Sequence, residues 1–199
     1  MAKRCFDILF SLSGLILLSP VFIFLSIIIL IDSKGGIFYK QFRVGKNGVD
    51  FKLYKFRSMR IGSDVKGLLT IGGRDSRITN SGYFIRKYKL DELPQLINVL
   101  IGDMSLVGPR PEVRKYVELY NKEQLKVLTI KPGITDYASI QYSNENDILS
   151  QSQDPEKTYI DEVMPDKLKL NLRYINEIGV ITDLKIIFKT IKKIFFKLD

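Results

Sequence analysis

The stretch Ile8–Ile31, ILFSLSGLILLSPVFIFLSIIILI, carries no charged side chain and contains Ser19-Pro20 near its middle. A helix that crosses a bilayer needs about 20 consecutive apolar residues, so this run is long enough to do so. Pro20 lacks a backbone N–H and its ring clashes with the carbonyl of Ile16, so the helix must kink or break there. The Ser19 hydroxyl can satisfy a backbone group that the break releases. The sequence therefore predicts a membrane segment built as helix, break and helix.

The charges around this segment bear on its topology. Lys3 and Arg4 precede it, and the chain after Asp32 is strongly basic. A single straight crossing would leave positive charge on both faces of the membrane, which the positive-inside rule disfavours. If the chain turns back at the break, two arms of about 12 residues, each roughly 18 Å long, dip into one leaflet. From the residues alone, a Pro-kinked anchor that crosses once and a re-entrant hairpin both fit residues 1–34. A cleaved signal peptide fits less well, because no small-residue cleavage site follows the long apolar run.

The composition restricts the possible chemistry. Residues 35–199 leave about 165 residues, enough for one compact domain. The 31 Lys and Arg residues outnumber the 22 Asp and Glu, and the net charge of +9 suits anionic lipid, a phosphorylated substrate or nucleic acid. The chain has no His, which excludes serine–histidine triads and histidine zinc sites, and its one Cys, Cys5, excludes an intrachain disulfide. Catalysis would use carboxylates, Lys, Tyr or Ser, with a hard, oxygen-bound metal such as Mg²⁺ if any.

The patterning of residues 35–199 predicts an α+β, mostly helical domain around a compact core. Two aromatic and β-branched runs, 37–44 and 49–56, flank Gly45-Lys46-Asn47-Gly48, which is typical of a β-hairpin. Further helices are predicted at 82–87, 112–120 and 122–129, and two more end near residue 178. The segments without regular structure are predicted to be an irregular stretch at 60–82, a rigid loop at 102–111, a turn at 131–133 and a polar stretch at 141–154.

The C-terminal segment 179–198 predicts an amphipathic helix. One side carries Leu184, Ile187, Phe188, Ile191, Ile194, Phe195 and Leu198, and lysines mostly flank or oppose that stripe. A basic helix with a wide apolar face can lie in the membrane interface, where each lysine near anionic lipid contributes about 1 kcal/mol. Packing on the protein core with solvated lysines is the alternative. The hydrophobic N-terminal segment favours the interfacial position.

The pair Asp91-Glu92 is the strongest candidate for catalysis within the domain. Apolar residues follow at helical spacing, so a helix is predicted to begin at the pair, with Asp91 as its N-cap and Pro94 in its first turn. A helix N-terminus favours an ionised Asp91, which can attack phosphorus or hold Mg²⁺. Glu92 adds shared metal binding or proton transfer. Ordinary helix capping produces the same pattern, so the pair alone does not establish an active site.

Basic residues supply the context for this pair. Arg110 lies between Pro109 and Pro111, Arg86 precedes Asp91 by five residues, and Lys55 and Arg57 end the predicted hairpin. Guanidinium is the planar, bidentate donor that suits phosphate oxygens, and a loop stiffened by two prolines holds it with little entropy left to lose. Together with the acidic pair, the absence of His and the membrane segment, these cations indicate phosphoryl chemistry at a bilayer.

At these residues the chain resembles the bacterial sugar transferases known as monotopic phosphoglycosyl transferases, in their small form. The resemblance covers nearly the whole chain. It rests on these motifs, in order: Ser19-Pro20, Lys55-Phe56-Arg57-Ser58-Met59, Arg86, Asp91-Glu92-Leu93-Pro94-Gln95, Asn98-Val99-Leu100, Gly102-Asp103-Met104-Ser105, Val107-Gly108-Pro109-Arg110-Pro111 and Lys131-Pro132-Gly133-Ile134-Thr135.

The resemblance implies an enzyme on the cytoplasmic face of the bacterial inner membrane that moves a sugar 1-phosphate from a UDP-sugar to undecaprenyl phosphate and releases UMP. This reaction is the first membrane step of glycan assembly, so downstream glycosyltransferases are expected partners. Asp91 would be the nucleophile of a covalent intermediate, and Glu92 a Mg²⁺ ligand or a base. Arg110 would hold phosphate, with Lys55, Arg57 and Arg86 as further contacts. The Ser19-Pro20 break would underlie a re-entrant helix, which favours the hairpin topology.

One departure from the family pattern concerns the donor. Many members follow Lys-Pro-Gly-Ile-Thr with Gly and a later Ala-Gln pair, whereas this chain has Asp136-Tyr137-Ala138-Ser139. This region and the polar stretch after it are expected to help select the donor, for which we predict an N-acetylated or amino-modified hexose. Two rival hypotheses remain: a membrane-tethered nucleic-acid-binding protein, disfavoured because no such motif occurs, and a non-catalytic lipid-binding scaffold.

Overall fold

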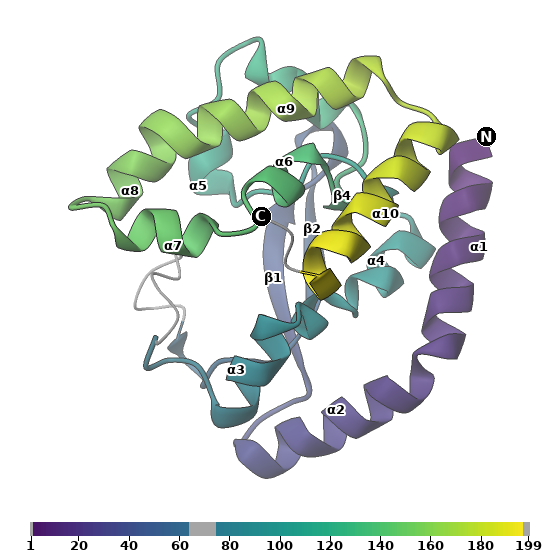
Figure 1. Cartoon of the computed structure of the whole chain (residues 1–199), viewed down its shortest axis with the longest axis vertical. Helices are drawn as coiled ribbons and strands as arrows, with labels where there is room; N and C mark the ends of the chain where they lie inside the picture. Colours follow the sequence, from purple (N-terminus) through teal and green to yellow (C-terminus); the bar gives the residue numbers. More distant parts are fainter. Residues whose placement is uncertain (1, 64–74, 197–199) are drawn as a thin grey trace.

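The structure, a computed structural model of the chain, describes residues 2–63 and 75–196 and is mostly helical (Figure 1). Within these residues the strands form two small sheets of two strands each. The predicted fold class, mostly helical with a small hairpin, is confirmed. The predicted irregular stretch 60–82 includes residues 64–74, which lie outside the described residues.

The N-terminal apolar stretch forms two helices, α1 (Ala2–Leu17) and α2 (Ser19–Asp32), bent by 59° at the break between them. Pro20 lies in the first turn of α2, and the Ser19 hydroxyl donates to the carbonyl of Ile16 at 2.8 Å. The predicted break and its compensation by Ser19 are confirmed. Among the described helices, none is long and apolar enough by itself to cross a membrane, whereas α1 and α2 together reach that length and composition.

The start of α1 is bound to the body of the protein, along α4 (Gln95–Ile101) and α10 (Val180–Phe196) (Figure 1). Lys3 donates to the Val107 carbonyl at 3.0 Å and forms an ion pair with the fully buried Asp183. Arg4 donates to two backbone carbonyls near the end of α4, at 2.6 and 2.9 Å. Asp7 is buried and accepts from the backbone N–H of Leu106 at 3.0 Å. The first turns of α1 are therefore part of the folded domain.

The end of α2 is bound to the same body. The Arg57 guanidinium donates to the Ser33 carbonyl at 2.6 Å, just after α2, and Asp32 accepts from the backbone N–H of Ser81 at 2.8 Å in α3 (Asn80–Lys87). The apolar side of α2 shares a hydrophobic cluster with β2 and α3, made of Leu25, Ile29, Phe56 and Ile85. The two ends of the bent pair thus attach to one domain.

The predicted hairpin is confirmed. β1 (Phe38–Val44) and β2 (Asp50–Phe56) pair antiparallel, with Phe38 opposite Phe56. The connection is a 3₁₀ turn, Lys46–Gly48, in which Asn47 and Gly48 adopt positive φ angles of 58° and 75°. Asn and Gly are the residues that tolerate this backbone region best, which explains why the Asn-Gly pair stands at the turn.

A second sheet was not predicted. β3 (Ser105–Val107) and β4 (Gly133–Thr135) pair in parallel, where the sequence analysis placed a loop and a turn. The backbones of Gly108 and Gly133 approach so closely that a Cβ on Gly133 would lie 2.1 Å from the Gly108 nitrogen. Strands of three residues are too short to show an alternating pattern, so the prediction of loop and turn was wrong here.

Several helix boundaries also differ from the prediction. The segment predicted as helix 112–120 contains only α5 (Arg114–Val117), because the Glu112 carbonyl accepts from the Val44 N–H of β1 and Val113, the N-cap, adopts an extended conformation. The segment 122–129 contains a 3₁₀ helix, Gln124–Thr129. The region after β4 contains α6 (Tyr137–Gln141), α7 (Glu145–Ser150) within the predicted polar stretch, and a nearly continuous run of α8 (Pro155–Thr158), a π turn (Tyr159–Val163) and α9 (Met164–Asn176).

The C-terminal helix α10 has two apolar sides rather than the one predicted. Ile186 is fully buried in a cluster with Val107 and Tyr174, and Ile187 packs against that cluster. Leu184 belongs instead to an exposed set with Ile181, Phe188 and Ile191. Leu198 and the side chain of Phe195 lie outside the described residues. α10 therefore packs on the core through one side and leaves a second apolar side exposed.

Candidate active site

The acidic pair lies in a 3₁₀ helix, Leu90–Glu92, between α3 and α4. The residue before it, Lys89, adopts a left-handed conformation with φ of 56°. The following α-helix begins only at Gln95, after Pro94. The prediction that Asp91 caps this helix is therefore wrong: the pair forms a separate turn that Lys89 initiates and Pro94 separates from α4.

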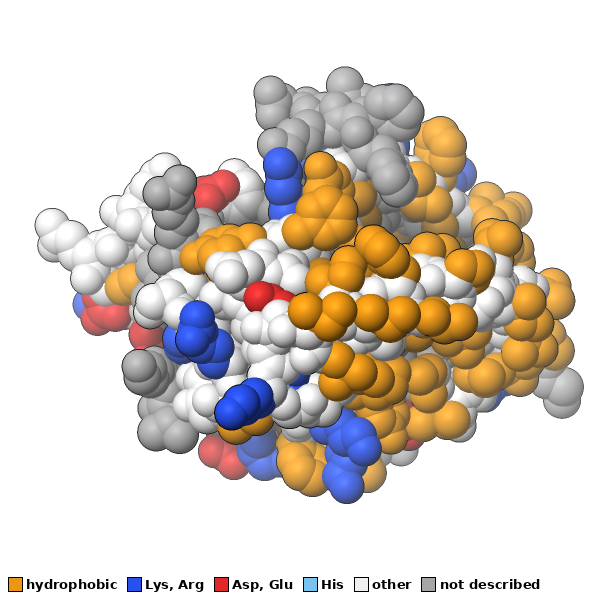
Figure 2. Space-filling model, turned by 90° about the horizontal axis from the view of Figure 1, so that it is seen from below, with side chains coloured by type: hydrophobic (Ala, Val, Ile, Leu, Met, Phe, Trp, Pro, Cys, Tyr) orange, Lys and Arg blue, Asp and Glu red, His pale blue; other side chains and the backbone are white. Residues whose placement is uncertain are grey.

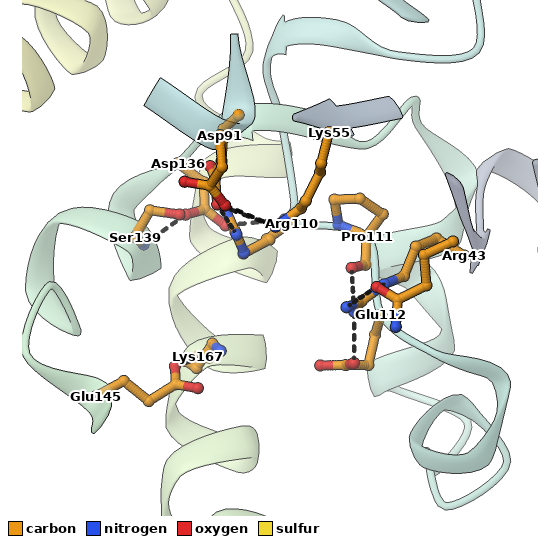
Figure 3. A network of polar contacts seen from close by, with 12 residues as sticks. Arg43, Lys55, Asp91, Arg110, Pro111, Glu112, Asp136, Ser139, Glu145 and Lys167 are labelled. Carbon is orange, nitrogen blue, oxygen red and sulfur yellow. Dashed lines mark hydrogen bonds and ion pairs between the residues drawn. The ribbon is translucent and has the colours of Figure 1, made fainter. Parts of the chain in front are cut away.

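Two cations hold the acidic pair. The Lys55 ammonium, from the end of β2, lies 3.4 Å from Glu92 Oε1 and 3.9 Å from Asp91 Oδ2. Arg110 binds Glu92 with both ends of its guanidinium: Nη1 donates to Oε2 at 3.1 Å, and Nη2 donates to Oε1. Figure 3 shows Asp91, Lys55 and Arg110 converging from three separate segments of the chain. The structure thus brings together four of the predicted site residues.

Burial acts in the same direction on the pKa values of the two carboxyl groups, but the neighbouring charges separate them. Burial raises the pKa of Asp91, and the charge of Glu92 adds to this, while Lys55 and Arg86 act in the opposite direction. Burial also acts to raise the pKa of Glu92, but the charges of Arg110 and Lys55 outweigh it and hold that pKa well below its usual range. The expectation that a helix N-terminus favours ionised Asp91 is corrected, because the pair does not cap a helix. Neighbouring carboxyl groups whose pKa values are pushed apart are suited to different roles in one reaction.

The remaining predicted phosphate contacts divide into two groups. The charge of Arg86 acts on Asp91, and Pro109 and Pro111 are buried on either side of Arg110. Because 34% of the Arg110 side chain is exposed, it can meet a ligand as well as Glu92. Arg57 does not lie with this group: it is buried, and its guanidinium donates to backbone carbonyls at the end of α2.

The structural role of Asp136 was not predicted from the sequence. This residue is fully buried, accepts from the backbone N–H of Arg110 at 3.1 Å, and caps α6 by accepting from the Ser139 N–H. Figure 3 shows Asp136 between its two partners, Arg110 and Ser139. An Asp at the start of a short helical segment is a common N-cap signal, but it says nothing about the Arg110 loop 26 residues earlier.

The donor set of the acidic pair fits Mg²⁺. Within residues 2–63 and 75–196, no group of three or more Cys, Asp or Glu side chains is arranged to hold a metal. Mg²⁺ commonly binds only one or two protein carboxylates together with substrate phosphates and water, and Asp91 and Glu92 supply that number. Each carboxylate oxygen has two lone pairs. Glu92 Oε1 already accepts from both Arg110 and Lys55, whereas the contact of Oε2 with Arg110 leaves one lone pair for a metal ion.

The family pattern of bacterial sugar transferases matches residues 1–197 of this chain. The chain belongs to the bacterial sugar transferase family. Among its relatives are the UDP-N-acetylgalactosamine-undecaprenyl-phosphate N-acetylgalactosaminephosphotransferase of Aeromonas hydrophila, 36% identical over 96% of this chain and 43% of the relative, and the UDP-glucose:undecaprenyl-phosphate glucose-1-phosphate transferase of Escherichia coli, 36% identical over 97% and 40%. An exopolysaccharide production protein of Rhizobium leguminosarum is 37% identical over 95% of this chain and 92% of the relative. The chain spans about two fifths of the length of the first two of these sugar transferases.

Proposed function

We propose that this sugar transferase moves a sugar 1-phosphate from a UDP-sugar to undecaprenyl phosphate and releases UMP. The observation that carries the proposal is the pairing of a buried Asp91 of raised pKa with a Glu92 that Arg110 and Lys55 keep ionised. Two relatives bear names that describe this exchange with different donor sugars. The site chemistry and the family therefore point to the same reaction class.

In the first step, a carboxylate oxygen of Asp91 attacks the phosphorus that carries the sugar. An acyl phosphate bond to Asp91 forms, and the phosphoanhydride bond to the UMP phosphate breaks, so UMP leaves with the bonding electrons. Lys55 lies beside both carboxylates, and Arg110 is partly exposed next to them. These cations can stabilise the negative charge that develops on the transferring phosphoryl oxygens.

In the second step, a phosphate oxygen of the lipid attacks the same phosphorus. The new pyrophosphate bond forms, the bond to Asp91 breaks, and the Asp91 carboxylate is restored. The lipid phosphate attacks as its dianion, so this step needs no proton transfer. The low pKa of Glu92 keeps it ionised but makes it a weak base, which favours the role of Mg²⁺ ligand over that of proton acceptor. Arg86, whose charge favours ionised Asp91, would support the departure of that carboxylate.

Mg²⁺ is part of the proposal. Asp91 and Glu92 would hold it together with substrate phosphate oxygens. When bound, the ion would supply positive charge against the pyrophosphate of the donor.

We also propose that α1 and α2 form a re-entrant membrane segment, with the active site on the cytoplasmic face of the bacterial inner membrane. Two observations support this: the 59° bend at Ser19-Pro20, and the attachment of both ends of the pair to one domain. Figure 2, the view from the α2 side, shows a broad hydrophobic patch with Lys and Arg side chains at its margin. Exposed apolar residues of the pair include Leu9, Phe10, Ile16, Leu17, Ile23, Phe24, Ile27, Leu30 and Ile31. Reporters fused to the two termini should both be reached from the cytoplasm and not from the periplasm; opposite locations would refute the hairpin.

The donor is proposed to be a UDP-linked N-acetylated or amino-modified hexose. The named relatives use N-acetylgalactosamine in one case and glucose in another, so the family name alone does not select the sugar. The decisive experiment gives detergent-purified protein Mg²⁺, undecaprenyl phosphate and a panel of UDP-sugars, one at a time, and measures UMP. Release that requires the lipid and one acetylated or amino-modified donor supports the proposal, and release with UDP-glucose only would refute the donor assignment.

A second measurement tests the covalent intermediate directly. With the donor but no lipid, the enzyme should release one equivalent of UMP and gain the mass of a sugar phosphate on the peptide that contains Asp91. The variant Asp91→Asn should do neither. Lipid binding without UMP release from any donor, unchanged in Asp91→Asn, would instead favour the non-catalytic scaffold.

A further inference from the structure

We propose that Asp136 is a positioning residue that fastens the loop Pro109-Arg110-Pro111, so that Arg110 keeps its two-point contact with Glu92. This inference rests on the proposed function, because it assigns Asp136 a part in arranging that active site.

Because two of its three residues are prolines, this loop has one backbone N–H, and Asp136 is its acceptor. Proline has no backbone N–H, so the N–H of Arg110 is the one backbone donor available between residues 109 and 111. Asp136 Oδ2 accepts that N–H at 3.1 Å. The backbone N–H of Arg110 therefore fixes the loop to the carboxylate of Asp136, the residue that directly follows β4.

The opposite side of the loop is fixed by backbone. The Gly133 N–H donates to the Pro109 carbonyl at 3.0 Å, and the Gly108 N–H donates to the Thr135 carbonyl at 3.0 Å. Asp136 follows β4 directly, so the strand that holds the start of the loop also delivers the carboxylate that holds Arg110. The guanidinium of Arg110 then reaches Glu92 from a backbone anchored on both sides.

Asp136 uses its two oxygens for two different partners. Oδ2 accepts from the Arg110 N–H, and Oδ1 accepts from the Ser139 N–H at the start of α6. The residue is 0% exposed, so water cannot replace either bond. An asparagine has only one acceptor oxygen, and its NH₂ group would face a second N–H donor. Since Asn caps helices about as well as Asp, Asp136→Asn should keep the α6 cap and lose the bond to Arg110.

The test compares Asp136→Asn with a matched cap variant, Asp154→Asn. Asp154 caps α8 by accepting from the Lys157 N–H at 3.0 Å and is exposed on the surface. It shares the N-cap role of Asp136 but does not contact Arg110. A change seen in Asp136→Asn and absent from Asp154→Asn is thus not a general effect of replacing an Asp N-cap by Asn.

The first readout is hydrogen exchange, which does not depend on activity. Residues 109–111 contain one exchangeable backbone amide, so that of Arg110 can be followed by itself. We expect it to be protected in the wild type and to exchange at least about tenfold faster in Asp136→Asn, because a factor of ten corresponds to the loss of about 1.4 kcal/mol of hydrogen bonding. Unchanged exchange in a folded variant would overturn the proposal. If the variant does not fold, the wild type decides: a protected Arg110 amide supports the proposal, and a freely exchanging one refutes it.

The second readout is UMP release, with kcat and KM measured separately. A displaced Arg110 no longer holds its two-point contact beside the reacting phosphate, so in Asp136→Asn kcat should fall about tenfold. In an Arg110→Ala background the same substitution should add little further loss, because its effect acts through Arg110. Unchanged kcat in Asp136→Asn, or fully additive losses, would refute the positioning role. A wild type that releases no UMP would refute the proposed function, while the hydrogen-exchange readout would still test the role of Asp136.

Discussion

Lys55 and Arg57 leave the same end of β2 two residues apart, yet they serve two different regions of the molecule. Lys55 lies against the carboxylates of Asp91 and Glu92, at 3.9 and 3.4 Å. Arg57 is buried and donates to the Ser33 carbonyl at 2.6 Å and to the Ile29 carbonyl at 3.3 Å, at the end of α2. One cation faces the acidic turn, and the other holds the base of the bent helix pair.

The difference between these two regions lies in their acceptors. The carboxylates beside Lys55 can share it with a phosphate or a metal ion. The carbonyls beside Arg57 are backbone acceptors at the end of α2: that of Ile29, which also accepts from the Ser33 N–H at 3.3 Å, and that of Ser33, just after the helix. Two nitrogens of Arg57, Nε and Nη1, are also buried with no hydrogen-bond partner among the described residues. We infer that Lys55 serves the reaction and that Arg57 serves the attachment of α2, and the following predictions test that division.

The largest effect is expected at the acidic turn itself, for Asp91→Asn. An amide cannot replace the nucleophilic carboxylate, so UMP release should fall by about 10³-fold or more. Stability should hold or rise, since burial disfavours the ionised form of Asp91 and an amide carries no charge. Turnover and urea unfolding should be measured together, with exposed Asp147→Asn as the control. Normal turnover in Asp91→Asn would show that the Asp91 carboxylate is not the nucleophile.

The next effect is expected for Arg110→Lys. A lysine keeps the charge but not the planar two-point contact with both oxygens of Glu92. The expected loss in kcat is about 10²-fold, the size seen when one positioned donor is removed from an active site. The control is Arg114→Lys, an exposed arginine paired with Asp50. Equal kcat in both variants would show that geometry at Arg110 does not matter.

A smaller effect, on pH dependence, is expected for Lys55→Gln. The Lys55 charge lowers the pKa of both Asp91 and Glu92, so its removal should raise both pKa values. As the pH falls, each carboxylate is then protonated at a higher pH than in the wild type. The acidic limb of the pH profile of kcat/KM should therefore move to higher pH. Lys52→Gln, an exposed lysine on the same strand, should leave the limb in place. A limb that stays fixed in Lys55→Gln would contradict the assignment of Lys55 to the reaction.

The smallest effect on turnover is expected for Arg57→Met. This change removes the donors to the end of α2, so the free energy of unfolding should fall by about 2 kcal/mol, a value typical of hydrogen bonds from a charged group. The kcat of the folded protein should stay within about twofold of the wild type. A large loss of kcat with unchanged stability would show that Arg57 contacts substrate, as the sequence predicted. Lys55 and Arg57 would then both serve the reaction.

Much of the site was predictable because the residue types carry the chemistry. An acidic pair, an arginine between two prolines and a chain without His already indicated phosphoryl transfer. The assignment of Arg57 to the same site was not supported, because a list of cations near one motif does not say which way each side chain turns after the strand ends. The position of Asp91 as a helix cap was wrong, because Lys89 adopts a left-handed conformation that starts a separate turn.

The sequence by itself determined the break at Ser19-Pro20, the β1–β2 hairpin and the chemical class of the acidic pair. Each depends on a property of neighbouring residues: the missing N–H of proline, the positive φ angles that Asn and Gly tolerate, and the charge of a carboxylate. Only the tertiary structure decided which cation meets which carboxylate, how burial and the neighbouring cations separate the pKa values of Asp91 and Glu92, and that Asp136 accepts from the Arg110 N–H. These depend on contacts between residues far apart in the chain and on exclusion of water, for which no local pattern in the sequence gives a signal.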